Sequence, residues 1–184
     1  MSTVIPSRLK RPRVLMIVVV AIIVLGSFLV YWLFPRPQAP SWLFEGAYAK
    51  YYGETSILLL TVKVTCRLEV LAFNSTHARI HTYVKAETSL GTQEFQNTTW
   101  ADLGKKIYEI GGTSPTRSYE ESIYVEGIGT RDCMVYEYSY LPPIWLYVDK
   151  EIGFPIKMKV GTSDTVSYSL DLNLVETNIP RLKE

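Results

Sequence analysis

The stretch YVDKEIGFPIKMKV (147–160) places two carboxylates, Asp149 and Glu151, on either side of a lysine. Paired carboxylates can act as general acid and general base, but this chemistry needs a cleft, desolvation and a partner that separates their pKa values. The surrounding sequence indicates none of these, because alternating apolar residues on both sides predict two strands joined by a hairpin connection. Gly153 can adopt a positive φ, and Pro155 stands near the start of the returning strand, where it removes little pairing. We therefore expect Asp149 and Glu151 to be solvated turn residues.

The two histidines and two cysteines are the other side chains that commonly bind metals or act in catalysis. His77 and His81 share a face of a predicted strand, but they stand about 13 Å apart, too far to bind one ion. Cys66 and Cys133 are too few and too distant in the sequence for a zinc site. The chain also lacks the GxSxG, HExxH, P-loop and dinucleotide-binding motifs. We therefore predict no metal, no cofactor and no enzymatic activity.

Covalent modification is the remaining chemistry of these residues. A disulfide between Cys66 and Cys133 is permitted in an oxidising compartment, and two separate buried thiols are the alternative. Asn74 and Asn97 each begin an Asn-x-Ser/Thr triplet. Such triplets are candidate N-glycosylation sites in an organism that glycosylates its exported proteins.

The N-terminal part of the chain predicts a membrane anchor. Residues 14–34 are apolar and uncharged, and their length is close to the roughly 20 residues that cross a bilayer as a helix. A cleaved secretory signal is the alternative, but its apolar region spans only about 7 to 15 residues, and the sequence downstream lacks a small-x-small cleavage pattern. The sequence favours an uncleaved signal-anchor. Prolines at positions 35, 37 and 40 predict an extended stalk over residues 35–41.

Charge predicts the orientation of this anchor. Residues 1–13 contain no acidic residue and four basic ones: Arg8, Lys10, Arg11 and Arg13. The positive-inside rule therefore places the N-terminus in the cytoplasm and residues 42–184 outside the cell membrane. The chain has 19 basic and 18 acidic residues, so the part after the helix has a formal charge of −3. This charge gives no basic surface for nucleic acid, and we predict no nucleic-acid partner.

The outer part, residues 42–184, predicts a single antiparallel β domain. Apolar and polar residues alternate over 60–72 and again over 78–86, which is typical of strands with one buried face. Short connections predict antiparallel pairing of neighbouring strands. Eight strands are predicted, at residues 44–52, 60–72, 78–86, 119–126, 131–140, 144–148, 154–160 and 165–176.

One segment departs from the alternation. Trp100, Leu103, Ile107 and Ile110 follow helical spacing, which predicts one short helix. A strand over residues 95–100 followed by a loop is the competing interpretation.

The predicted hairpin supports a resemblance to a known superfamily. A strand, the pattern V-D-K-E-x-G-x-P-x-K and a second strand resemble a hairpin of the lipoprotein-carrier half-barrel superfamily, which includes the bacterial lipoprotein-localisation carriers. The preceding GIGTRDCMVYEY (127–138) resembles the segment before that hairpin. The resemblance implies a curved, half-barrel-like antiparallel sheet whose concave apolar face is partly covered by helix. A permanent anchor departs from the carriers and argues against shuttling between membranes.

The resemblance leads to a candidate binding face and two candidate functions. The apolar ligand face would comprise Val62, Val64, Leu68, Leu170 and Leu172. The first candidate is a non-catalytic, single-pass membrane protein whose extracytoplasmic domain binds a lipid or other apolar ligand in the concave sheet. The alternative is a structural or accessory subunit that docks on a membrane or cell-envelope complex through the same domain.

Overall fold

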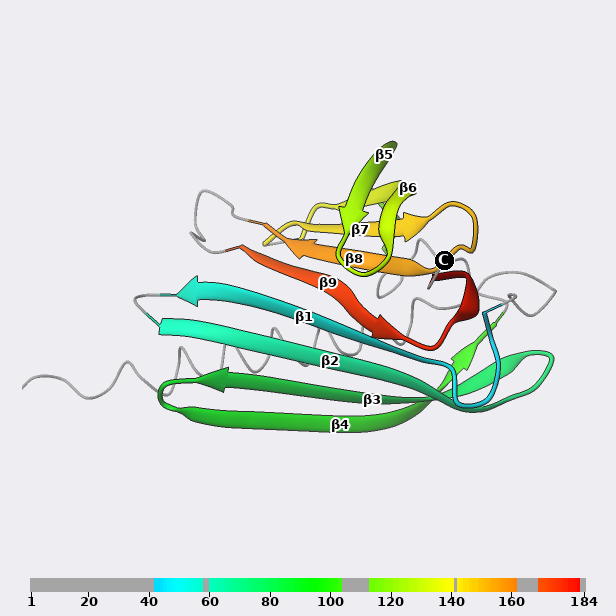
Figure 1. Cartoon of the computed structure of the whole chain (residues 1–184), viewed down its shortest axis with the longest axis horizontal. Coiled ribbons are helices and arrows are strands. Elements are labelled where there is room, and N and C mark those ends of the chain that lie inside the picture. Colours follow the sequence, from blue (N-terminus) through cyan, green and yellow to red (C-terminus); the bar gives the residue numbers. More distant parts are fainter. Residues whose placement is uncertain (1–41, 58–59, 104–112, 141, 162–168, 183–184) are drawn as a thin grey trace, which may run out of the picture.

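The computed structural model describes residues 42–57, 60–103, 113–140, 142–161 and 169–182 (Figure 1). The predicted cytoplasmic segment, membrane helix and stalk lie outside these residues. Within the described ranges, no helix combines the length and the apolar character needed to cross a bilayer.

Nine antiparallel strands form one open sheet in the order β4-β3-β2-β1-β9-β8-β7-β6-β5 (Figure 1). The strands are β1 (Tyr48–Ile57), β2 (Leu60–Phe73), β3 (His77–Thr88), β4 (Gly91–Asp102), β5 (Arg117–Val125), β6 (Gly129–Tyr138), β7 (Ile144–Asp149), β8 (Pro155–Val160) and β9 (Leu170–Thr177). Each of the eight predicted strands has a counterpart, although several ends differ. The mainly β, antiparallel fold class is therefore confirmed.

The alternation in β2 and β3 appears directly as alternating burial. Cys66 pairs with Val84, and Leu68 pairs with Thr82, so the buried side chains of the two strands lie on one side of the sheet. We call this side the apolar face and the opposite side the outer face. The turn between the strands is held by Asn74, whose Oδ1 accepts hydrogen bonds from the backbone N–H groups of the next residues.

The predicted short helix is wrong at its start. Trp100 belongs to β4, where it pairs with Arg79, and Ala101 pairs with Ala78. Cross-strand pairing with β3 satisfies the backbone of this segment and overrides the helical spacing of its apolar residues. Residues 104–110 of the predicted helix lie outside the described residues. Among the described residues the one helical element is the single 3-10 turn η1 (Pro180–Leu182).

The sheet consists of two meanders joined at a single seam. Strands β1–β4 follow one another in space, as do β5–β9, and the two sets meet where β1 pairs with β9. Side chains reinforce the seam: Thr177 Oγ1 donates to the carbonyl of Tyr48 at 2.7 Å, and Asn178 accepts from the N–H of Tyr48 and donates to the carbonyl of Gly46. The seam therefore has both ladder and side-chain hydrogen bonds.

Strand β7 is buried on both of its faces. Leu146 lies on the apolar face, because it pairs with Met158 and through it with Leu172, while Tyr147 points to the outer face, and both are buried. Strand β5 contacts β9, and Figure 1 shows the β5–β6 hairpin drawn across β7 and β8. The hairpin therefore covers the outer face of the neighbouring strands, and the outer-facing Val135 of β6 is fully buried.

Tyr51 connects β1 to β8 over the apolar face. Its hydroxyl donates to the carbonyl of Pro155 at 2.8 Å, with β9 lying between the two strands. Burial raises the pKa of this phenol well above its usual value, so the hydroxyl stays protonated and remains a donor.

We expect Tyr51→Phe to lower the free energy of unfolding by about 1 kcal/mol, because a buried carbonyl loses its hydroxyl donor. The matched control is Tyr52→Phe, which removes a hydrogen bond to Glu54 on the exposed outer face. Denaturant unfolding of both variants measures the difference. Equal stability of the two variants would show that the Tyr51 hydroxyl does not support the sheet.

Candidate functional site

The predicted ligand face is occupied by packed side chains. Val62, Val64, Leu68, Leu170 and Leu172 all point to the apolar face and are at most 5% exposed. They belong to one hydrophobic core cluster that extends across the sheet. The structure thus places the five residues on one face, and their role in binding a ligand stays a prediction.

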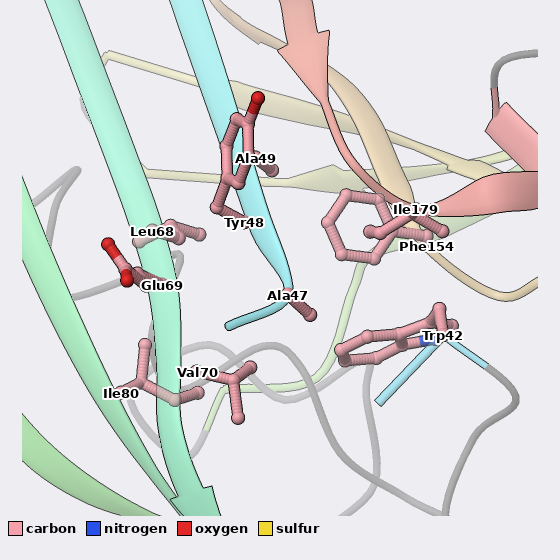
Figure 2. A pocket seen from close by; sticks show the side chains of 10 residues that line it. All are labelled: Trp42, Ala47, Tyr48, Ala49, Leu68, Glu69, Val70, Ile80, Phe154 and Ile179. Carbon is pink, nitrogen blue, oxygen red and sulfur yellow. The ribbon is translucent and has the colours of Figure 1, made fainter. Parts of the chain in front are cut away.

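A small cavity lies beside Leu68 in this core. Figure 2 shows Trp42, Phe154 and Ile179 converging on it from three separate segments. The rings of Trp42 and Phe154 meet edge to face, with centroids 5.0 Å apart. The cavity leaves a volume of about 10 Å³, which is close to the minimum that holds one water molecule. Among the described residues, this part of the apolar face has no room for a lipid chain.

A larger hollow lies on the outer face, beside the tip of the β5–β6 hairpin. It is open, encloses about 480 Å³, and is lined from the hairpin by Gly127 and Ile128 and from the seam by Tyr48 and residues 175–177. Glu176 accepts a hydrogen bond from the hydroxyl of Tyr48 at 2.9 Å. This hydrogen bond lowers the pKa of the Glu176 carboxyl and raises the pKa of Tyr48. The hydrogen bond therefore favours the ionised form of the Glu176 carboxyl.

Asp149 is not a solvated turn residue, and this part of the expectation is wrong. The β7–β8 hairpin forms as predicted, with Gly153 at φ +65°, but Asp149 is only 1% exposed. Its Oδ1 accepts the backbone N–H groups of Glu151 at 2.9 Å and Ile152 at 3.0 Å. Asp149 is buried because it faces the outer side of β7, which the β5–β6 hairpin covers. Glu151 does lie in solvent, with 66% of its side chain exposed.

Arg131 supplies the positive charge beside this buried carboxylate. Its Nη1 lies 3.9 Å from Oδ2 of Asp149 and 3.8 Å from Oε2 of Glu151. Its Nη2 donates to the carbonyl of Arg181 at 2.9 Å. Arg131 therefore links the β7–β8 hairpin to β6 and to η1. The two carboxylate oxygens of Asp149 contact backbone N–H groups and the guanidinium of Arg131. These contacts give the carboxylate a structural role in the loop.

The two cysteines are separate, buried free thiols. Cys66 lies in β2 and Cys133 in β6, and four strands stand between β2 and β6 in the sheet. Burial raises the pKa of Cys66 to about 12. Burial, together with the neighbouring charge of Asp149, raises the pKa of Cys133 to about 12. Of the two alternatives left by the sequence, the structure has the separate thiols.

The histidines and the sequons lie on the surface. His77 contacts the hydroxyl of Thr76, and His81 contacts that of Thr98 on β4. The described part of the chain contains no group of three or more side chains that could hold a metal ion. Asn74 lies in the exposed β2–β3 turn, whereas Asn97 lies within β4. Glycosylation at either position stays a prediction.

Comparison with known proteins adds no family assignment. No family model matches the chain, and no curated protein matches its sequence. The resemblance to the lipoprotein-carrier half-barrel superfamily therefore stays a prediction.

We expect Asp149→Ala to lower the free energy of unfolding by about 2 to 4 kcal/mol, because it leaves two backbone donors unpaired and removes the carboxylate beside a largely buried arginine. Glu151→Ala is the matched control, and it should change stability by no more than about 0.5 kcal/mol. Denaturant unfolding measures both. Similar effects of the two substitutions would show that the contacts of the Asp149 carboxylate do not stabilise the turn.

For the cysteines, we expect neither thiol to react with iodoacetamide in the folded protein at pH 8, and both to react after unfolding without reductant. With a pKa of about 12 in the folded state, only about one thiol in ten thousand is ionised at pH 8. The folded state binds these protons more tightly than the unfolded state, so the stability is full below pH 9 and falls as the pH rises towards 12. If the unfolded chain shows thiols only after reduction, the disulfide exists instead.

Proposed function

We propose that the chain is a single-pass membrane protein whose extracytoplasmic β domain is a non-catalytic accessory subunit of a membrane or cell-envelope complex. Residues 14–34 would anchor it, residues 1–13 would stay in the cytoplasm, and residues 35–41 would form the stalk. The single observation that supports a docking role over ligand binding is the packing of the apolar face, where about 10 Å³ is left beside Leu68.

Exposed apolar residues support a docking role. Leu71 and Phe73 lie near the end of β2, and Trp100, which is 58% exposed, lies near the end of β4, at the same end of the sheet as the β2–β3 turn. Phe73 pairs with the buried Ala78 and Trp100 with the exposed Arg79, so their rings lie on opposite faces of this end. Large exposed apolar side chains that gather in one region are typical of surfaces that contact other molecules. This end of the sheet is the proposed contact region with the complex.

Lipid binding remains the second candidate, and a different observation favours it. The contact between Tyr51 and Pro155 passes over β9, which requires the sheet to bend towards its apolar face. A bent sheet with a continuous apolar face is consistent with the half-barrel-like fold implied by the superfamily resemblance. In such a fold, a ligand rather than the protein's own side chains can occupy the concave side.

One pair of substitutions on β2 separates the two functions. Leu68 is 3% exposed, and Leu71, three residues later, is 41% exposed. In the accessory subunit, Leu68→Arg buries an unpaired charge and should prevent folding, whereas Leu71→Arg should change stability by no more than about 0.5 kcal/mol. Thermal unfolding followed by circular dichroism, and native mass spectrometry of residues 42–184, measure the outcome.

The accessory function predicts no amphiphile bound to the wild-type domain in the mass spectrum. A folded Leu68→Arg variant that no longer binds an apolar fluorescent probe, together with a stoichiometric amphiphile on the wild type, would establish lipid binding and contradict the proposal.

A further inference from the structure

The outer edge of β4 is a long sheet edge with which none of the described strands pairs. The strand spans 12 residues, pairs with β3 without any register shift, and has no strand on its other side among the described residues. Most of its side chains are exposed. Natural sheets usually protect such edges with prolines, lysines, bulges or short strands. Strand β4 contains no proline and no basic residue, and its acidic residues are Glu94 and Asp102 alone.

The strand at the opposite end of the sheet differs from β4 in its charge and its contacts. Strand β5 has nine residues and carries three charges, from Arg117, Glu120 and Glu121. It also contacts β9, because its hairpin folds onto the outer face. Strand β4 is therefore the longer and less charged of the two edge strands among the described residues.

The chemistry of the edge defines the partner that it would take. The unpaired N–H and C=O groups of an edge strand are matched by another extended strand. Residues 95–101 of β4 are uncharged, so the edge does not select a charged peptide. An identical strand that runs antiparallel is self-complementary, because a two-fold axis repeats every contact. We propose that the occupant of this edge is a second copy of the chain, paired β4 to β4 across a two-fold axis.

Two registers keep the apolar faces of both copies on the same side and pair nearly the whole strand. Side chains that face each other across an antiparallel ladder lie on the same face of the sheet. One residue of β4 must therefore face its own copy, with the two-fold axis midway between them. Either Gln96 or Asn97 at the axis allows the longest pairing. Glu94 then faces Thr98 or Trp100 of the second copy. Neither register places like charges opposite each other, an arrangement that would destabilise the pair.

The size of the contact predicts a weak dimer. About 11 paired residues at roughly 3.4 Å each give a strip near 37 Å long, and a strip about 10 Å wide covers roughly 400 Å² on each copy. A standard stable interface covers about 800 Å² on each partner. The affinity should therefore be micromolar or weaker, and covalent trapping is the suitable measurement.

Cysteine trapping of the full-length chain tests the pairing. Gln96→Cys and Asn97→Cys are made separately, purified in detergent from a bacterium that does not glycosylate, and oxidised with copper phenanthroline. The residue at the axis faces its own copy with Cα atoms about 4.5 to 5.5 Å apart, within the range that a disulfide spans, so one of the two variants should form at least ~tenfold more dimer than Ser122→Cys. Ser122 is exposed on the β5 edge and serves as the matched control. Dimer yields at both β4 positions no higher than the control would overturn the proposal.

A charge variant provides the second measurement. The double variant Gln96→Lys with Asn97→Lys places like charges at the axis in either register, and sedimentation equilibrium should show a dimer at least ~tenfold weaker than the wild type. The matched control, Ser118→Lys with Ser122→Lys on β5, should leave the dimer unchanged. If the β4 lysines leave the association constant unchanged, or if the β5 lysines alone weaken it, the β4 pairing is wrong.

Discussion

The burial of β7 on both faces is the constraint on which the rest of this half of the sheet depends. A strand covered on one side needs a single apolar face, but β7 carries Leu146 on one face and Tyr147 on the other, and both must leave water. Leu146 is buried on the apolar face of the sheet. The β5–β6 hairpin covers Tyr147, because it folds onto the outer face and contacts β9. The position of one short apolar strand thereby determines the path of two others.

The same cover explains why a carboxylate lies in the interior. The β7–β8 turn lies beside the covered region, so its backbone N–H groups have little access to water. Asp149 accepts two of them and lies beside Arg131, which satisfies the buried donors locally. A hydrophobic residue at this position would leave those donors unpaired. The carboxylate is therefore a structural part of the turn, and its type does not indicate catalysis.

The sequence predicts the local features of this fold and fails where distant segments decide the outcome. Alternation over β2 and β3 predicts their strands and their buried faces, because the pattern directly reflects one dry side. Strand β4 is given only as the competing interpretation, over residues 95–100, because TQEFQNTTW is mostly polar on both sides, as suits a sheet edge, while Trp100 and Leu103 lie at helical spacing by coincidence. The burial of Asp149 is missed because its cover comes from β5 and β6. The continuous apolar run before Asp149 was a signal for a strand buried on both sides. Alternation in the sequence predicts which side chains share the apolar face. Whether a ligand or other side chains of the protein cover that face depends on packing between distant segments, which no local pattern encodes.

The seam between β1 and β9 has a consequence for the order in which the protein folds. Within β1–β4 and within β5–β9, the strands that pair are neighbours in the sequence. The seam between β1 and β9 instead joins residues near position 50 to residues near position 175. During synthesis the first meander can form early, but β1 keeps an open edge and an apolar face until the last strand emerges from the ribosome. Long-range pairing of this kind is slow to nucleate. The newly made chain therefore passes through a stage at which β1 can pair wrongly, and this stage ends only when β9 pairs with β1 and Thr177 and Asn178 form their hydrogen bonds across the seam.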